Sequence, residues 1–424
     1  MKLLFMWLVA VALIVPLILI ADLVGDRGKT RDEAAFEIGR SWGDRQSLLG
    51  PVVVVPFEET LAAGDSPART RVRQAYFLPE SLDISGTIEP ETRYRGIYDV
   101  VVYTARLTFT GQFGAPDFSP WNVDPDHIRW DEAFLAFGIT DMRGIKDAVT
   151  LAWRNAEVIF SSGTNEAELV VPTGMSARVE VQQGGMYSFD LALDGSRALQ
   201  FVPVGKTTNV ELSSPWPSPS FNGAFLPDER NISDEGFTAS WQVLDLNRPY
   251  GQQWRDQAGG LMESAFGLSL AVPVDEYRKT MRAVRYAALI IVLTLLAFFI
   301  IEVRFRKRAH PFQYLLVGLA LCLFYLLLLS LSEQMPFNWA YGVSGGATIS
   351  LITLYVRALF GSRSLAVLTT GVLAILYCFT FSLLQLEDYA LLVGSIGLFV
   401  LLALTMYLTR NFEQFRTREQ STAN

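Results

Sequence analysis

The sequence predicts a membrane α-helical fold of six transmembrane helices, with a large β-rich, sandwich-like α+β domain inserted between helix 1 and helix 2. Two apolar regions predict the helices: no charged residue lies between Lys2 and Asp22, and the chain after Tyr286 is almost wholly apolar to its end. An apolar run of roughly 20 residues crosses the bilayer as a helix, which satisfies its own backbone hydrogen bonds. About 260 polar, turn-rich residues between the two regions predict the inserted domain.

The charge distribution limits the possible partners of this domain. Hydrophobic residues make up 50% of the chain and the mean hydropathy is +0.27, too apolar for an ordinary soluble domain. Residues 22–282 hold 37 acidic and 24 basic residues, a net charge of −13, whereas the remainder carries +5. The domain would repel phosphate, so we expect no nucleic-acid partner.

The positions of the cysteines show how the large domain must be stabilised. The two cysteines, Cys322 and Cys378, both lie in apolar runs, and the large domain has none. This domain therefore cannot form an internal disulfide, and its hydrophobic core must hold it.

The first apolar run, Leu3 to Ala21, predicts an uncleaved anchor. A signal peptide would have an apolar region of about 7–15 residues before a small-x-small cleavage site. This run is longer and ends in Ile20-Ala21-Asp22-Leu23, a poor cleavage site. We expect Pro16 to kink the helix without ending it.

Five further apolar runs predict the other spans, and their short connections predict antiparallel neighbours. The spans are Ala283–Ile301, Tyr314–Ser332, Trp339–Phe360, Leu365–Leu384 and Tyr389–Thr409. The expected division of the chain is an anchor at 1–22, a domain at 23–282 with a helical stalk at 23–42, a bundle at 283–410 and a tail at 411–424.

Positive residues in the short loops predict the orientation. Basic residues follow the second and fourth spans and the last span, whereas the loops at 332–338 and 385–389 have none. This alternation agrees with six crossings. It predicts a multi-pass membrane protein with both termini in the cytoplasm and residues 23–282 on the far side.

Signals in the domain are mainly those of β-strands. A helical stalk is expected to end near Trp42-Gly43, and Val52–Val55 predicts a buried strand. Polar and apolar residues alternate in Arg106–Thr110 and again from Tyr187 to Leu193 and around Val210 and Leu212. Such short strands, separated by turn signals, predict an antiparallel sandwich.

Two finer predictions concern connections in this domain. Asp194-Gly195 predicts a hairpin turn with Ala198–Val202 as the returning strand. Phe77-Leu78-Pro79-Glu80 and Phe225-Leu226-Pro227-Asp228 are similar strings. They suggest either an internal duplication or two unrelated hairpin corners, and we favour the second interpretation.

The sharpest catalytic pattern is Gly342-Val343-Ser344-Gly345-Gly346, because Gly-x-Ser-Gly in a membrane helix is the nucleophile motif of rhomboid proteases. A serine nucleophile needs a base, and the two histidines, His127 and His310, lie outside the spans. We therefore favour a packing face formed by Gly342-x-x-x-Gly346.

Acidic groups in the domain provide weaker candidates. Asp124-Pro125-Asp126-His127 with Asp131-Glu132 resembles a metal site, but one histidine among surface carboxylates is more often solvated. Asp228-Glu229 and Asp234-Glu235 read as solvated loops. Accordingly, we assign no catalytic, cofactor-binding or metal-binding residue and expect a protein that is not an enzyme.

Ionisable residues of the bundle lie near the ends of the expected spans. Glu302, Glu333 and Arg357 are expected to reach water by snorkelling, so an ion relay is poorly supported.

Long strings of residues nearly throughout the chain resemble the CreD family of inner-membrane proteins. They are Ser41–Gly43, Leu49–Pro56, Gly96–Tyr103, Gly138–Ile145, Trp216–Gly223, Phe225–Pro227, Pro273–Tyr277 and His310–Ala320. The resemblance implies that the membrane is the inner membrane and that residues 23–282 lie in the periplasm. It further implies a role in cell-envelope integrity and the envelope stress response, including the response to β-lactams. It implies no catalytic residue.

The expected function is a non-enzymatic contribution to envelope integrity, through contacts of the periplasmic domain with periplasmic or inner-membrane protein partners. Membrane lipids are the other expected partner. Two alternatives stay open: a transporter or lipid-handling protein that uses the bundle, and a periplasmic-domain enzyme that acts on envelope precursors. A polar cavity between spans would favour the first, and converging carboxylates would favour the second.

Overall fold

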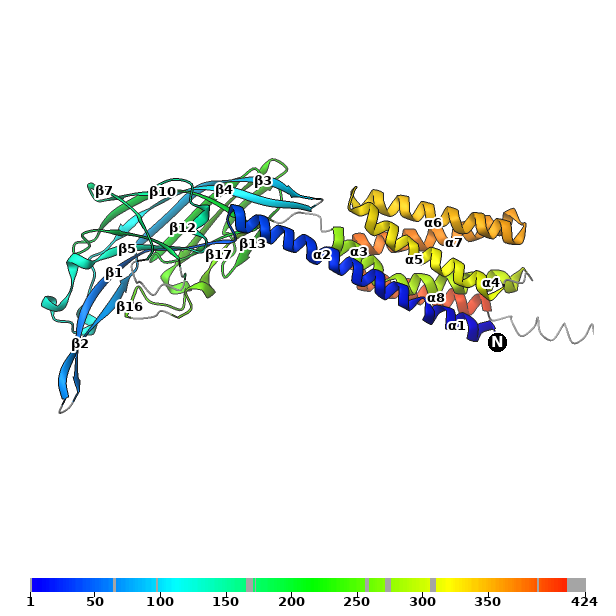
Figure 1. Ribbon diagram of the computed structural model, residues 1–424, viewed down its shortest axis with the longest axis horizontal. Coiled ribbons are helices and arrows are strands. Elements are labelled where there is room, and N and C mark those ends of the chain that lie inside the picture. The colour runs from blue at the N-terminus through cyan, green and yellow to red at the C-terminus, as the bar shows by residue number, and fades with distance from the viewer. Residues whose placement is uncertain are drawn as a thin grey trace, which may run out of the picture. The chain divides into compact units, whose positions relative to one another are not determined.

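The computed structural model describes residues 2–63, 66–96, 98–164, 171, 173–255, 259–270, 276–305, 310–386 and 389–409. The chain forms two compact units (Figure 1). The first, which is helical, combines Met1–Arg31 with Val274–Asn424, and the second, Asp32–Pro273, is β-rich. The membrane boundaries expected near residues 22 and 282 stay predictions.

The helices are long and mostly apolar. Their bounds are α1 Lys2–Ala12, α2 Ile14–Trp42, α3 Glu276–Arg285, α4 Ala287–Arg304, α5 Pro311–Ser332, α6 Phe337–Phe360, α7 Arg363–Gln385 and α8 Ala390–Thr409. Among the described residues, four helices are long and apolar enough to cross a membrane, and a fifth if the α3–α4 pair, bent by 43°, is one span.

A local break separates α1 from α2 at Leu13, three residues before Pro16. The proline has no N–H to donate to the carbonyl of Ala12, where α1 ends. The helix nevertheless continues: the Leu17 amide donates to the Leu13 carbonyl at 3.4 Å, and α2 ends at Trp42, next to Gly43.

Helix α5 is central to the bundle, because it contacts α1, α3, α4 and α6. Its Gly318 permits the close approach of α1. A Cβ atom at this position would lie 2.1 Å from Leu13 Cδ1, and Leu13 is only 1% exposed. Small residues allow such approaches between membrane helices.

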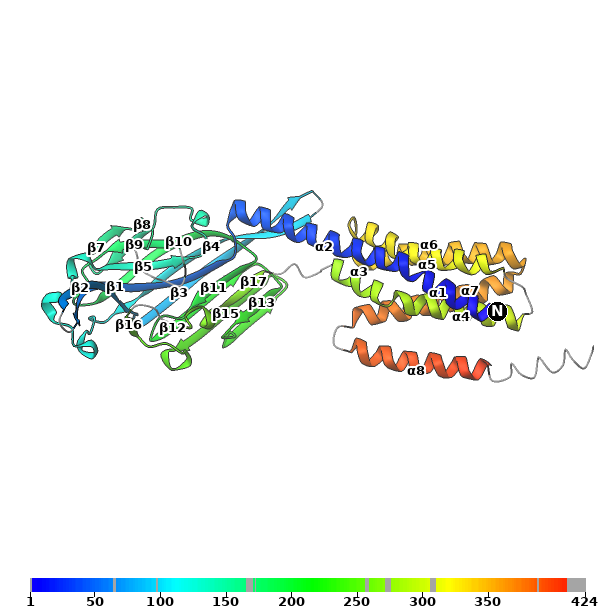
Figure 2. The same cartoon turned by 60° about the horizontal axis from the view of Figure 1, so that its bottom comes forward.

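Two sheets form the β-rich unit (Figure 2). Sheet 1 has the order β13-β17-β11-β1-β5-β9-β8, with β2 paired to β1 and β16 paired to β2. Sheet 2 has the order β14-β15-β12-β3-β4-β10-β6-β7. The bounds are β1 Gln46–Ala63, β2 Ser66–Phe77, β3 Ser81–Arg95, β4 Tyr98–Phe113, β5 Phe134–Ile139, β6 Thr150–Trp153, β7 Ala156–Ile159, β8 Ser161–Ser162, β9 Gly174–Arg178, β10 Gly185–Ser196, β11 Ala198–Val202, β12 Thr207–Ser214, β13 Pro219–Gly223, β14 Glu229–Ser233, β15 Gly236–Leu244, β16 Gln253–Arg255 and β17 Phe266–Leu270.

The sheets pack face to face through aromatic side chains. The ring of Phe109 on sheet 2 lies 5.1 Å from that of Phe137 on sheet 1 and 4.8 Å from that of Phe189. All three side chains are buried. The large buried area of aromatic rings makes such clusters a main source of core stability.

Several strand predictions are confirmed by the structure. Val52–Val55 lies in β1, where every residue from 46 to 57 is buried. The alternation of Arg106–Thr110 appears in β4, with Leu107 and Phe109 inward, and that of Tyr187–Leu193 appears in β10. Val210 and Leu212 point inward from β12.

The prediction of a hairpin turn at Asp194-Gly195 is wrong. Both residues lie within β10, where they pair with Thr104 and Tyr103 of β4. The turn comes at Arg197, which has φ of 65°, and β11 then enters the other sheet, parallel to β1. A hairpin signal fails here because the chain changes sheets at this position and does not return beside β10.

Four strands from the first half of the unit's sequence (β1, β3, β4 and β5) and four from the second half (β11, β12, β15 and β17) are arranged in the same way in the two sheets. β1 and β11 are parallel neighbours at the centre of sheet 1, as β3 and β12 are in sheet 2. β5 and β17 flank the first pair, and β4 and β15 flank the second. The similar strings at 77–80 and 225–228 precede β3 and β14, which do not correspond, so they do not mark this symmetry.

Candidate functional site

The end of α2 meets both sheets of the β-rich unit at one point, which we call the junction cluster. It comprises Trp42, Asp44, Gln46, Asp141, Arg143, Lys146 and Asp194. Gly43 permits the contact: it has φ of 151°, and a Cβ atom there would lie 2.5 Å from the Asp194 carbonyl oxygen. Only glycine fits this position without strain.

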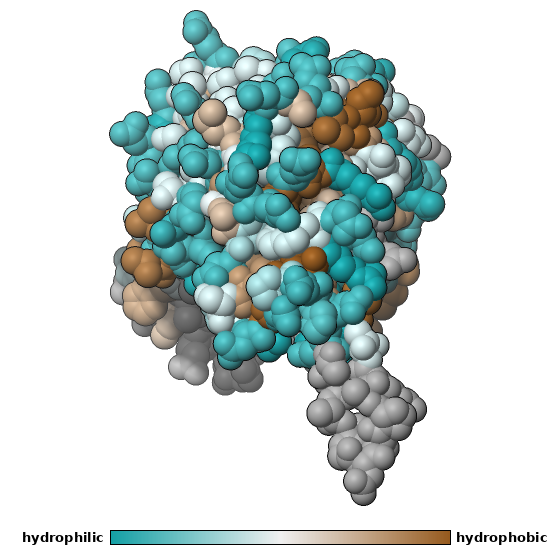
Figure 3. Space-filling view, turned by 90° about the vertical axis from the view of Figure 1, so that its left-hand side faces the viewer, coloured by the Kyte–Doolittle hydropathy of each residue, from teal (hydrophilic) through white to brown (hydrophobic). Residues whose placement is uncertain are grey.

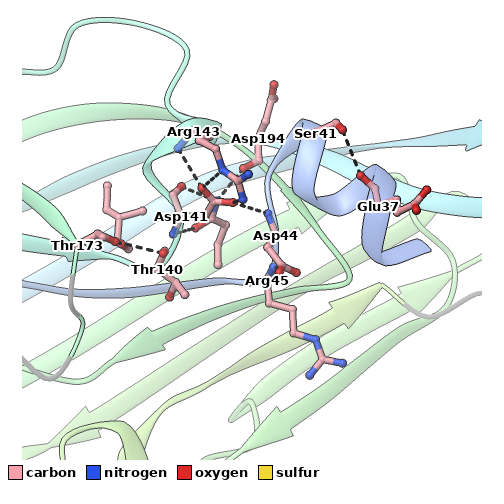
Figure 4. Close-up of polar contacts among 11 residues, drawn as sticks. Glu37, Ser41, Asp44, Arg45, Thr140, Asp141, Arg143, Thr173 and Asp194 are labelled. Carbon is pink, nitrogen blue, oxygen red and sulfur yellow. Dashed lines mark hydrogen bonds and ion pairs between the residues drawn. The ribbon is translucent and has the colours of Figure 1, made fainter. Parts of the chain in front are cut away.

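Asp141 is the central acceptor of the cluster (Figure 4). Its carboxylate accepts hydrogen bonds from the Arg143 guanidinium at 2.6 and 2.8 Å and from the Arg143 amide at 3.1 Å. The Asp44 amide, just after α2, donates to Oδ2 at 3.0 Å. Chiefly because of the Arg143 hydrogen bond, the pKa of Asp141 is lowered to about 2, so its charge is present at neutral pH.

Gln46 joins the two sheets at the first residue of β1. Its fully buried amide donates at 3.0 Å to the carbonyl oxygens of Asp141 and Asp194, and its Oε1 accepts from the Asp141 amide at 3.2 Å. Asp141 follows β5 in sheet 1, and Asp194 belongs to β10 in sheet 2. One side chain thus fixes the spacing of both sheets next to the helix end.

Cations complete the cluster around Trp42. Lys146 pairs with the Asp194 carboxylate at 3.3 Å, and its ammonium lies 5.7 Å from the centre of the Trp42 ring. The Arg93 guanidinium lies 4.6 Å from the same ring. Cation–π contacts of this kind hold an aromatic side chain in a fixed orientation.

This arrangement connects a helix to a domain and offers no reacting group. Each side-chain polar atom of Asp141 and Gln46 is used in an internal hydrogen bond. Sequence reasoning did not identify the cluster. The string Gly138–Ile145, which contains Asp141 and Arg143, was the available signal, but the partners of Asp141 after α2, Asp44 and Gln46, lie 97 and 95 residues away in the chain.

The outer face of sheet 2, which we call the open face, is a polar surface of the described unit. Side chains of β3, β12 and β15 alternate between buried and exposed, whereas β1 and β5 at the centre of sheet 1 are buried on both faces. A hydrogen-bonded row crosses the open face: Gln242 donates to Asn209 at 3.2 Å, and Asn209 donates to Asp83 at 2.7 Å.

Two shallow hollows of about 510 and 610 Å³ lie on the open face. Their linings include no lysine or arginine. They contain six carboxylates: Asp83, Glu89, Glu211, Asp228, Glu229 and Glu235. On the end of the unit seen in Figure 3, too, hydrophilic residues predominate and hydrophobic ones form small groups.

Ser344 is buried in α6, but the expected packing face is wrong. The buried stripe contains Tyr341, Ser344, Gly345 and Thr348, spaced as one side of a helix. Gly342 and Gly346 are exposed, and a Cβ atom at either would meet nothing within 4 Å. The close approach instead occurs at Gly345, beside the Tyr377 ring.

No base accompanies Ser344 among the described residues. Its hydroxyl has no hydrogen-bond partner there. The histidine of the bundle, His310, is the N-cap of α5, where its ring accepts from the Phe312 amide at 3.3 Å. The residues around Ser344 therefore lack the pair that serine nucleophiles require.

The acidic candidates of the domain take part in local contacts. The Asp124 carboxylate accepts from the Asp126 amide at 3.1 Å, and Glu132 pairs with Arg129 at 3.1 Å. His127 and Asp131 are exposed. Within the described part of the chain, no group of three or more His, Cys, Asp or Glu residues could hold a metal ion.

Of the ionisable residues in the bundle, Glu302 differs from expectation. It is 3% exposed, and its carboxylate accepts a hydrogen bond from the Tyr314 hydroxyl at 2.5 Å, so it does not reach water. Burial between α4 and α5, with a hydroxyl to satisfy the carboxylate, explains the difference. Glu333 is 14% exposed and binds Arg27 and Tyr277, whereas Arg357 is exposed.

A cavity between α4, α5, α6 and α7 bears on the transporter alternative. Its lining includes Thr294, Phe298, Val317, Ile352 and Thr369, and it holds about 10 Å³. This volume is at most that of one water molecule. It is not the polar cavity that a solute pathway requires.

Comparisons of the chain with a family model and with a known protein agree. Residues 1–414 match a family model described as "Inner membrane protein CreD". The chain is also 31% identical over 414 residues to the Inner membrane protein CreD of Escherichia coli strain K12, an alignment that covers 95% of this chain and 91% of that protein.

Proposed function

The chain belongs to the CreD family of inner membrane proteins, and from this premise we propose that it contributes to cell-envelope integrity through protein contacts of its β-rich unit. The proposal extends to the envelope stress response, including the response to β-lactams. It assigns the protein a non-enzymatic role.

The proposed topology has six crossings, with the β-rich unit in the periplasm and both termini in the cytoplasm. Four apolar helices, the bent α3–α4 pair and the 20-residue helix α8 supply the six segments. The basic residues of the short loops support the orientation.

The observation that carries the proposed function is the open face of sheet 2. Soluble sandwiches often leave one face in water, but this face has two adjoining hollows whose linings hold six carboxylates and no lysine or arginine. One of the six, Glu89, pairs with the neighbouring Arg106 at 3.7 Å. Side chains that offer hydroxyl, amide and carboxylate groups suit contacts with a polar protein surface. The Asp124 carboxylate accepts a hydrogen bond from a neighbouring amide, and Glu132 pairs with a neighbouring arginine. These structural contacts support a non-enzymatic role.

A complementation experiment tests the proposal. In a strain that lacks the gene, the wild-type chain is expected to reduce leakage of a periplasmic marker enzyme under a sublethal β-lactam. The charge-reversal pair Glu211→Lys and Glu229→Lys on the open face should restore less than half of this protection, because both carboxylates are exposed there.

The matched control reverses two exposed carboxylates elsewhere, Asp131→Lys in η3 (Trp130–Glu132) and Glu263→Lys in η6 (Met262–Ser264). This control should protect as the wild type does at equal membrane levels. Equal protection by both double variants would contradict the assignment to the open face, and a gene-deleted strain without an envelope defect would contradict the function itself.

A further inference from the structure

Seven cationic side chains surround one end of the helical unit, where α2 leaves it and α3 enters it. They are Arg27, Lys29 and Arg31 of α2 and Arg278, Lys279, Arg282 and Arg285 of α3, and we call them the basic collar. Described carboxylates along the same stretches are Asp22, Asp26 and Asp32 of α2, Glu276 of α3 and Glu333 after α5, fewer than the cations. The collar is thus a cationic region in a chain whose net charge is −8.

Contacts place the two halves of the collar at the same level. Gly25 of α2 lies beside α3, because a Cβ atom there would be 3.9 Å from the Met281 methyl group. The Arg31 guanidinium lies 5.5 Å from the centre of the Tyr277 ring. The Tyr277 hydroxyl donates to Glu333 at 3.2 Å, and Glu333 also pairs with Arg27 at 3.8 Å.

Helix α3 has the properties of a helix that lies at a membrane interface. Thr280, Ala283 and Val284 are buried against the bundle, whereas Arg278 and Arg285 on another side are exposed. The chain bends by 43° between α3 and α4, and α4 has no charged residue before Glu302. An amphipathic, arginine-rich segment at the edge of an apolar helix is typical of contact with lipid headgroups.

Topology does not account for these charges. The rule that places positive residues in the cytoplasm applies to short loops, and the connection between Arg31 and Arg278 is far longer than about 60 residues. Arginine also suits phosphate, because its planar guanidinium donates to two oxygens at once.

We propose that the basic collar binds the phosphate headgroups of anionic phospholipids in the leaflet that surrounds this end of the bundle. Arg278 and Arg285, on the exposed side of α3, bind the headgroup phosphates. Arg282 positions α3, since its guanidinium donates to the Leu386 carbonyl at the end of α7 at 2.8 Å. The inference is independent of the partner contacts proposed for the open face.

The test measures lipid binding to the full-length chain in a neutral detergent. Dioleoyl-phosphatidylglycerol is compared with dioleoyl-phosphatidylcholine, which has the same acyl chains. The wild type should bind the anionic lipid more tightly, and added salt should weaken this preference. Arg278→Gln with Arg285→Gln should weaken binding of the anionic lipid by roughly thirtyfold, since each interfacial cation contributes about fivefold.

Two control variants keep the result interpretable. Arg278→Lys with Arg285→Lys keeps the charge and should retain most of the binding, which shows that the helix folds. Arg357→Gln with Arg363→Gln removes two exposed arginines at the end of α6 and the start of α7 and should leave it unchanged.

The proposal would be overturned by wild-type binding in the Arg278→Gln and Arg285→Gln protein, by equal loss in the Arg357→Gln and Arg363→Gln protein, or by full competition by inorganic phosphate. The last result would indicate a site for free phosphate. If the purified wild-type chain retains an acidic protein and does not bind the anionic lipid, the collar would be assigned to a protein partner.

Discussion

At the scale of single residues, Asp141 shows how one carboxylate couples a helix to a domain. It accepts from the Asp44 amide, two residues after the end of α2, and from Arg143, while Gln46 holds the neighbouring backbone. Because Asp141 is 8% exposed, its charge depends on these donors and not on water. The stability of the helix–domain connection therefore depends on the ionised form.

Asp141→Asn should loosen the end of α2. The amide keeps the size of the side chain but loses the charge-assisted bonds, at a cost of about 1–2 kcal/mol, reduced by the half-exposed position of Arg143. Hydrogen exchange of residues 40–47 in the full-length protein should become faster. The control Asp190→Asn alters an exposed carboxylate that accepts only from Thr108 among its described contacts and should leave this exchange unchanged.

The same residue predicts a pH dependence. The pKa of Asp141 is lowered to about 2 in the folded protein, compared with about 3.9 in an unfolded chain. Its stabilisation is therefore complete above pH of about 4 and is lost as the pH falls through about 2. Exchange at residues 40–47, corrected for the intrinsic rate, should follow this course in the wild type. A similar course in the Asp141→Asn protein would assign the effect to another group.

At the scale of elements, small residues determine where helices approach. The structure assigns this role to Gly318 in α5 and Gly345 in α6, and not to the exposed Gly342 and Gly346. Helical periodicity limits which residues share a face, but it does not say which face is buried. In a membrane helix both faces are apolar, so hydropathy gives little further information.

Gly318→Ala should therefore destabilise the bundle by about 1 kcal/mol, because the clash with Leu13 exceeds the gain in helix propensity. Gly346→Ala, the same change at an open position, should be neutral or slightly stabilising. Thermal unfolding in detergent, followed by tryptophan fluorescence, measures both. Adding Leu13→Ala should reduce the effect of Gly318→Ala, and an unchanged effect in that background would show that the two side chains do not meet.

At the scale of the whole molecule, the proposed topology makes a labelling prediction. In a variant without Cys322 and Cys378, a single cysteine at Ser213 in β12 should react with an impermeant maleimide on cells whose outer membrane is permeabilised. A cysteine at Ser362, between α6 and α7, should react only after the inner membrane is also opened. The reverse pattern would place the β-rich unit in the cytoplasm.

The sequence by itself determined the apolar helices, the acidic inserted segment and the strands whose side chains alternate, such as Leu107 with Phe109. These features follow from hydropathy over a few neighbouring residues. Only the tertiary structure decided that Gly195 continues β10, that Gln46 meets Asp141 and Asp194, and that sheet 2 keeps an open face. Gln46 lies 95 and 148 residues from these partners. Such pairings depend on how the sheets pack together, and no local pattern specifies them.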